Sequence, residues 1–180
     1  MINDQVVVEN TPEPDVGRLR PRWRKALLAL HVAAAVGTFG AVLTLLVLML
    51  AGRGGADPIT VYPPGYRIET TIVVPLALTA LATGILLGVL TPWGLLRRPW
   101  TIIKLIVTPI LAALAIFVLS PRLDAVADAA RLGVPVSERD QLVLVIAPAF
   151  AGLALAVNVV LGIYKPAGRA RRRAAGPTGG

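Results

Sequence analysis

The sequence predicts an all-α protein, a transmembrane four-helix bundle with both termini in the cytoplasm. Three observations lead to this prediction. Only 16% of the 180 residues are charged, whereas a soluble domain carries about 25%. Four apolar stretches are each long enough to cross a hydrocarbon core about 30 Å thick, which takes about 20 helical residues. The density of Lys and Arg alternates between the connections, and this asymmetry sets the orientation.

The four predicted spans cover about residues 26–52, 70–90, 100–120 and 142–164. They show no alternation of period two, so helices are favoured over the strands of a barrel. The first span follows 25 mostly polar residues, and we expect it to be retained as an anchor. All ten Asp and Glu side chains lie outside the four spans. A carrier that uses a membrane carboxylate is therefore disfavoured.

The remaining segments are predicted from their composition. Residues 1–24 and 166–180 are expected to be disordered cytoplasmic segments on either side of a membrane domain of residues 25–165. The first outer connection, Arg53 to Glu69, is rich in Gly and Pro and is expected to hold little regular structure.

The third connection contains signals for helix starts. Ser120 followed by Pro121 starts a helix, and apolar residues then recur at helical spacing as far as Gly133, so a short helix on the outer surface is predicted. Ser137 and Asp140 have the spacing of a capping box and would start the fourth span.

Counting Lys and Arg in the flanks predicts the orientation. One side carries 12 of these residues and the other carries five. The positive-inside rule therefore predicts a multi-pass protein of the cell (inner) membrane with cytoplasmic termini. Aromatic residues agree with this, because four of them fall at the predicted cytoplasmic interface: Trp23, Trp93, Trp100 and Tyr164.

Small residues form a stripe at helical spacing on each span, which predicts one compact bundle. The first span has two such faces and is expected to be the central helix: Ala33, Gly37, Gly40 and Thr44 on one side, and His31, Ala35, Thr38 and Val42 on the other. The second span carries Ala77, Ala80, Gly84 and Gly88. Pro75, Pro109 and Pro148 are expected to kink their helices.

Three strongly polar side chains, His31, Lys104 and Asn158, lie within the predicted spans. At 1.5 Å per residue they lie about 6 to 9 Å inside the cytoplasmic boundary, and Thr83 approaches the same level. The sequence therefore predicts a polar cluster with His31 at its centre. Each member also has a purely structural interpretation. Lys104 can extend to the headgroups, Asn158 can bond to a neighbouring helix, and His31 can be a packing residue with satisfied hydrogen bonds.

Several short segments together resemble an uncharacterised family of small four-span bacterial integral membrane proteins. They are Leu30-His31-Val32, Val74-Pro75-Leu76, Thr83-Gly84, Thr91-Pro92-Trp93-Gly94-Leu95, and Trp100 with Lys104-Leu105. The likeness covers about Leu27 to Leu119 and is most specific around the pattern TPWGL-x4-W-x3-K. The resemblance implies a four-span fold and no assigned activity.

More distantly, the early His and the W-x3-K pattern are similar to the membrane protoporphyrinogen oxidase family and to copper-resistance D-type domains. The first resemblance implies haem b bound through His31, with Lys104 implicated. The chain departs from that family after the His, where Gly37-Thr38-Phe39-Gly40 stands in place of aromatic and arginine residues.

The composition excludes several classes of function. The chain has no Cys, one His and two Met, which disfavours disulfide, thiol and copper chemistry. No Gly-rich phosphate loop follows a strand, and the basic tail lacks aromatic stacking residues, so nucleotide and nucleic-acid partners are disfavoured. The lipid bilayer is the predicted partner, with anionic lipid at four tail residues: Arg169, Arg171, Arg172 and Arg173.

Two functions remain open. The first is a non-enzymatic structural or accessory membrane protein that packs within itself, as a homo-oligomer or against a membrane partner. The alternative is a haem b-binding redox protein with His31 as the axial ligand.

Overall fold

The computed structural model describes residues 20–90 and 99–163, and for residues 99–104 and 161–163 the backbone alone. The described elements are α1 (Pro21–Arg53), α2 (Pro58–Ile68), the π-helix η1 (Glu69–Val73), α3 (Val74–Val89), α4 (Pro99–Leu114), the π-helix η2 (Ala115–Leu119), α5 (Ser120–Arg131) and α6 (Glu138–Ile163). Within these ranges the chain is all-helical, as predicted.

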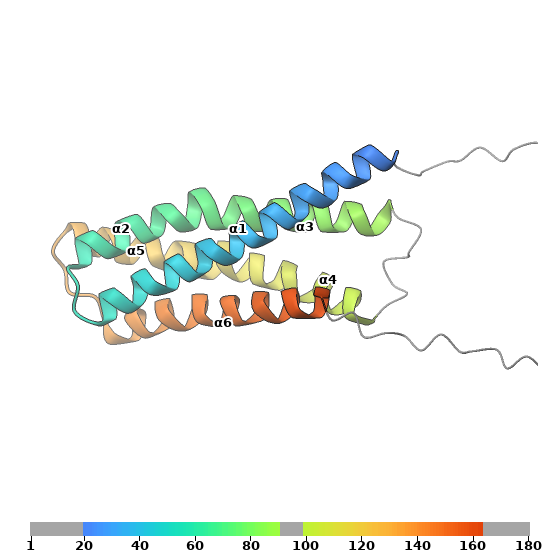
Figure 1. The fold of residues 1–180 in the computed structure, drawn as a ribbon. Helices are drawn as coiled ribbons and strands as arrows, with labels where there is room; N and C mark the ends of the chain where they lie inside the picture. Colours follow the sequence, from blue (N-terminus) through green and yellow to red (C-terminus); the bar gives the residue numbers. More distant parts are fainter. Residues whose placement is uncertain (1–19, 91–98, 164–180) are drawn as a thin grey trace, which may run out of the picture.

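The elements form four long antiparallel helices (Figure 1). α2, η1 and α3 join into one continuous helix, and α4, η2 and α5 join into another. Each of the four is long and apolar enough to cross a membrane. The start of α1 and the end of α6 lie at the same end of the bundle, and the short connections between α1 and α2 and between α5 and α6 lie at the opposite end (Figure 1).

The first connection differs from the prediction, because most of the segment from Arg53 to Glu69 is helical. The Asp57 side chain accepts a hydrogen bond from the Ile59 amide at 3.1 Å, and Pro58 occupies the first helical turn. These are helix-start signals, and they outweigh the Gly and Pro content further along. The irregular connection is therefore only a few residues long, and Gly55 turns it with a positive φ of 95°.

The segment predicted to be a short surface helix is also part of a longer one. α5 continues the third long helix without a break, and its Leu123 and Ala127 are fully buried. α5 packs beside α2. The helix from Pro58 to Val89 has 32 residues, which is about 48 Å at 1.5 Å per residue, longer than a hydrocarbon core of about 30 Å.

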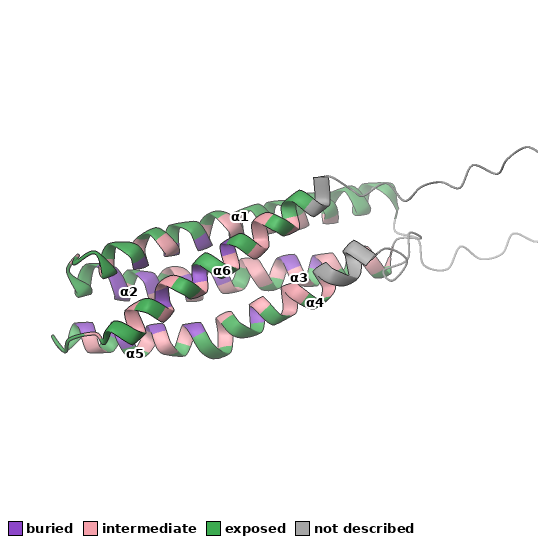
Figure 2. Ribbon diagram, turned by 90° about the horizontal axis from the view of Figure 1, so that it is seen from below, coloured by how far each residue is buried: buried purple, intermediate pink, exposed green. Residues whose placement is uncertain are grey.

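The main apolar core lies at the end of the bundle where α2 and α5 pack together. It is formed by buried side chains from α1, α2, η2, α5 and α6: Leu45, Met49, Val61, Tyr62, Leu119, Leu123, Val126, Ala127, Ala130 and Leu144. Figure 2 shows buried residues concentrated between the helices and exposed ones on their outer faces. Many large apolar side chains are exposed, including Phe117 and Leu153, as expected for helices that face lipid.

Both π-helices are followed closely by a proline. The Val74 amide donates to the Glu69 carbonyl, and the Ser120 amide donates to the Ala115 carbonyl, each five residues earlier. The next residues are Pro75 and Pro121. A proline has no amide hydrogen, and its ring crowds the carbonyl four residues earlier, so a wider turn before it relieves the clash. Pro75 was expected to kink its helix, and the structure has a π turn directly before it.

α1 buries its two small-residue faces to different extents. Thr38 and Val42 are buried, and α1 packs against α3 and α6. On the other face Gly40 and Thr44 are exposed, and nothing lies within 4 Å of the position that a Cβ of Gly40 would take. The face that contains His31 is therefore the more buried one, while Gly37 of the other face packs against Leu76 of α3.

Candidate functional site

His31 and Thr83 are brought together between α1 and α3. The His31 Nδ1 lies 2.9 Å from the carbonyl oxygen of Ala80 and 3.1 Å from the Thr83 hydroxyl. The Thr83 hydroxyl also donates to the Thr79 carbonyl at 2.6 Å, which ties its hydrogen to its own helix. Thr83 is buried and His31 is half-buried. The contact therefore joins the two helices through a partly desolvated hydrogen bond.

The partner of Nδ1 fixes which ring nitrogen carries the hydrogen. A carbonyl oxygen only accepts, so the His31 Nδ1 must donate to Ala80, and the Thr83 oxygen can share the same N–H. In the neutral ring the lone pair is then on Nε2. Gly84 leaves room for the ring, because a Cβ added there would lie 3.0 Å from the His31 Cε1. The small-residue face predicted for the second span thus receives the imidazole.

The other two predicted members of the polar cluster are Lys104 and Asn158. Lys104 lies in α4, but its side chain is outside the described residues. Asn158 is half-buried in α6 and makes no side-chain hydrogen bond with the described part of the chain. Gly152 packs near Val42 of α1, so at 1.5 Å per residue Asn158 and His31 lie on levels about 8 Å apart. Among the described side chains of the predicted polar cluster, only those of His31 and Thr83 are in contact.

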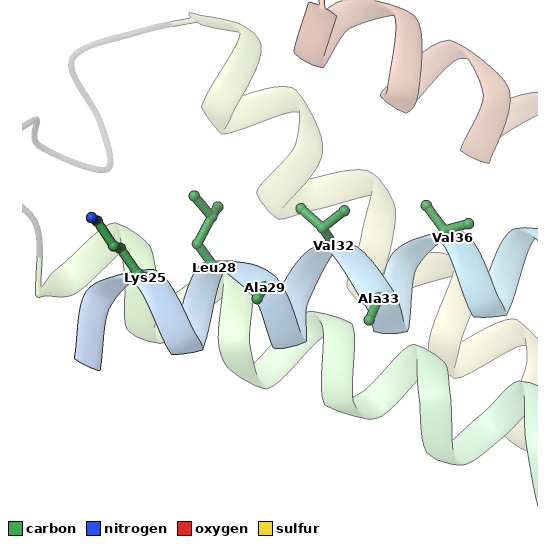
Figure 3. A pocket seen from close by; sticks show the side chains of 6 residues that line it. All are labelled: Lys25, Leu28, Ala29, Val32, Ala33 and Val36. Carbon is green, nitrogen blue, oxygen red and sulfur yellow. The ribbon is translucent and has the colours of Figure 1, made fainter. Parts of the chain in front are cut away.

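A shallow apolar groove, open to the surroundings, runs along the first turns of α1. It is lined by Lys25, Leu28, Ala29, Val32, Ala33 and Val36. In Figure 3 the Leu28, Val32 and Val36 side chains project from α1 on the side away from α3. His31 points toward α3 and does not line this groove.

The arrangement around His31 can be compared with what haem needs. An axial His commonly donates through Nδ1 to a carbonyl and binds iron through Nε2, and the bond to Ala80 agrees with that pattern. The apolar groove on the first turns of α1 lies on a different face of the helix from the His31 contact.

A buried carboxyl group lies in the helix that contains the second predicted span. Glu69 begins η1, within the helix from Pro58 to Val89, and its exposed fraction is 0%. The sequence analysis placed Glu69 in the first connection, and the helix continues through this position. A signal was present in the sequence, because Tyr62, Gly65, Glu69 and Val73 recur at intervals of three and four residues, which is one helical face, and all four are buried.

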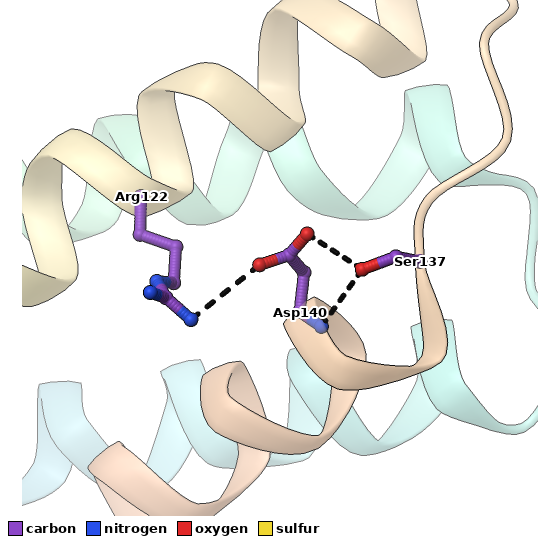
Figure 4. Close-up of polar contacts among 3 residues, drawn as sticks. All are labelled: Arg122, Ser137 and Asp140. Carbon is purple, nitrogen blue, oxygen red and sulfur yellow. Dashed lines mark hydrogen bonds and ion pairs between the residues drawn. The ribbon is translucent and has the colours of Figure 1, made fainter.

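Three polar residues join the start of α6 to α5 at the opposite end from His31 (Figure 4). The Ser137 hydroxyl accepts a hydrogen bond from the Asp140 amide at 3.1 Å and donates to the Asp140 carboxylate at 2.7 Å. The Arg122 guanidinium lies 3.5 Å from the same carboxylate. The predicted pairing of Ser137 with Asp140 is present, and it caps the helix.

Three polar features of the described residues are candidate sites: the bond of His31 to α3, the buried Glu69, and the exposed cap at Ser137. No protein-family model, curated protein or solved structure matches this chain.

Proposed function

We propose that this chain is a multi-pass protein of the cell (inner) membrane that acts as a structural or accessory membrane protein and not as an enzyme. The proposal starts from the four helices that are long and apolar enough to cross a membrane. Their outer faces carry exposed large apolar side chains such as Val47, Phe150 and Leu153. Such surfaces are stable in lipid and would aggregate in water.

The hydrogen bond of His31 to Ala80 is the main observation in favour of a structural role for this residue. An ionisable side chain within a membrane helix is a functional candidate by default, and His31 is the only His in the chain. Its Nδ1 hydrogen is used to hold α1 against α3, where Gly84 allows the close approach. This supports a packing histidine, one of the two interpretations that the sequence left open.

The orientation is part of the proposal. The start of α1 and the end of α6 lie at one end of the bundle (Figure 1), and the basic residues of the two flanks and of the second connection, 12 in all, belong to that end. The positive-inside rule places it in the cytoplasm. The tail arginines, Arg169 to Arg173, lie outside the described residues, and their binding of anionic lipid stays a prediction.

A visible spectrum of the protein purified in detergent separates the structural role from the haem b alternative. The structural role predicts a colourless protein that gains no Soret band when haem is added. A Soret band that is present in the wild type, lost in His31→Ala and kept in Asn158→Ala would instead identify a haem protein. Thr83→Val is a second control, because it changes a neighbour of His31 and keeps the imidazole.

A further inference from the structure

Glu69 and Ser120 form the one group of buried side-chain polar atoms without partners in the described part of the chain. The Glu69 Oε1 and Oε2 and the Ser120 Oγ are all inaccessible to solvent, and none has a hydrogen-bond partner. The Ser120 hydroxyl is near enough to act on the carboxyl group, although the two do not reach hydrogen-bond geometry. Buried polar groups are nearly always satisfied in folded proteins, so these three oxygen atoms require an explanation.

No described basic side chain neutralises Glu69. The titratable and charged groups on the packed elements are Tyr62, Tyr66 and Arg67 on its own helix and four residues on α5, with none on α1 between Val42 and Met49. The four on α5 are Arg122, Asp124, Asp128 and Arg131, of which Arg131 pairs with Asp128. Arg67 is exposed, and Arg122 pairs with Asp140 of α6. A buried carboxylate without a counter-charge is very costly, so Glu69 must be neutralised by something that binds to it.

Glu69 and Ser120 together supply three oxygen atoms and, when the carboxyl group is ionised, a single negative charge. Pro75 and Pro121 follow η1 and η2 and have no amide to donate to the carbonyls of Thr70 and Ile116, the next acceptors in the π register. A divalent metal site normally uses several carboxylates or imidazoles, and the described residues contain no group of three His, Cys, Asp or Glu that could hold a metal ion.

We propose that Glu69 and Ser120 form a binding site for a small monovalent cation, a proton or Na⁺, within the membrane-spanning part of the bundle. One carboxylate balances one positive charge, and the Ser120 hydroxyl supplies a second oxygen. Glu69 is 11 residues from the start of α2 and 20 from the end of α3, so the site lies nearer to the end with the short connections. The cation exchanges from that end, which is the outer one in the proposed orientation.

Labelling with dicyclohexylcarbodiimide tests the site, because this reagent modifies protonated carboxyl groups in apolar surroundings. The whole protein in detergent is treated at a series of pH values, and the adduct is located by peptide mass spectrometry. The proposal expects labelling of Glu69 in the wild type and in Glu138→Gln, a control at an exposed carboxyl. Glu69→Gln should lose the adduct at this position.

The conditions of labelling distinguish the two cations. A proton site loses labelling by up to about tenfold per pH unit, as a single titrating group does, and Na⁺ has no effect at constant ionic strength. A Na⁺ site is protected by Na⁺ and is not protected by choline. Ser120→Ala should shift the half-point of either titration, and an unchanged half-point would remove Ser120 from the site. Wild-type protein without an adduct at Glu69, or with labelling that neither pH nor Na⁺ changes, would overturn the proposal.

Discussion

At the scale of single residues, the two ionisable side chains discussed above differ in what their neighbours offer. His31 meets a carbonyl and a hydroxyl, both of which accept its N–H, and the contact holds two helices together. Glu69 meets a hydroxyl that does not reach hydrogen-bond geometry and is otherwise enclosed by the packed helices. The neighbours of His31 therefore satisfy its N–H, whereas those of Glu69 leave its carboxyl group in need of a ligand.

The role of His31 in packing predicts the cost of removing it. His31→Ala loses the bond to Ala80 and should lower the free energy of unfolding by about 0.6 to 2 kcal/mol, the range of interhelical hydrogen bonds in membranes. Unfolding in mixed micelles, followed by circular dichroism, measures the difference. Asn158→Ala is the control and should have a smaller effect, because Asn158 makes no side-chain hydrogen bond among the described residues. Equal losses in the two variants would contradict the role of His31.

Two glycines predict opposite effects of the same substitution. A Cβ at Gly65 would lie 2.7 Å from the Met49 Cε in the main core, so Gly65→Ala should destabilise the protein by about 1 to 3 kcal/mol through overpacking. Gly40 has open space around it, and Gly40→Ala should be neutral or stabilising by up to about 1 kcal/mol through helix propensity. The same unfolding assay compares them. A strongly destabilised Gly40→Ala would mean that another chain packs on this face.

At the scale of secondary structure, the start of α2 depends on its cap. Asp57→Ala removes the acceptor of the Ile59 amide and should cost about 1 kcal/mol, whereas Asp57→Asn keeps a capping side chain and should cost much less. Amide hydrogen exchange at residues 59–62 measures the effect locally and should be faster in the alanine variant only. Fast exchange throughout residues 58–68 of the wild type would contradict the helix itself.

The same elements show how far the sequence could predict the fold. Apolar length was enough to predict four helices and the all-α class, because a membrane span is specified by its composition over about 20 residues. The ends were not predictable in this way, since α2 and α5 continue past the apolar runs and are held by packing against each other. Counting residues from the ends of the spans correctly predicted that His31 and Thr83 lie at a similar depth. Glu69 was missed because Pro63, Pro64 and Gly65 indicated a loop where Asp57 and Pro58 start a helix.

At the scale of the whole molecule, the distribution of charge and the arrangement of the helices support the same orientation. The four helices leave the first and last described residues at one end, and this end carries the excess of Lys and Arg in the sequence. The core of large apolar residues lies at the other end, where α2 and α5 extend beyond a hydrocarbon core of ordinary thickness. The bundle is therefore packed most tightly on the side that we propose to be external.

The orientation predicts which introduced cysteines a membrane-impermeant maleimide can reach. The natural chain has no Cys, so each single variant reports one position without background. Gly55→Cys and Val134→Cys lie in the short connections and are exposed, and they should be labelled in intact cells. Thr178→Cys belongs to the basic tail and should be labelled only after the cells are opened, because the excess of positive charge retains that end inside. Labelling of Thr178→Cys in intact cells, with protection of the other two, would invert the proposed orientation and would place the entrance to the Glu69 site on the cytoplasmic side.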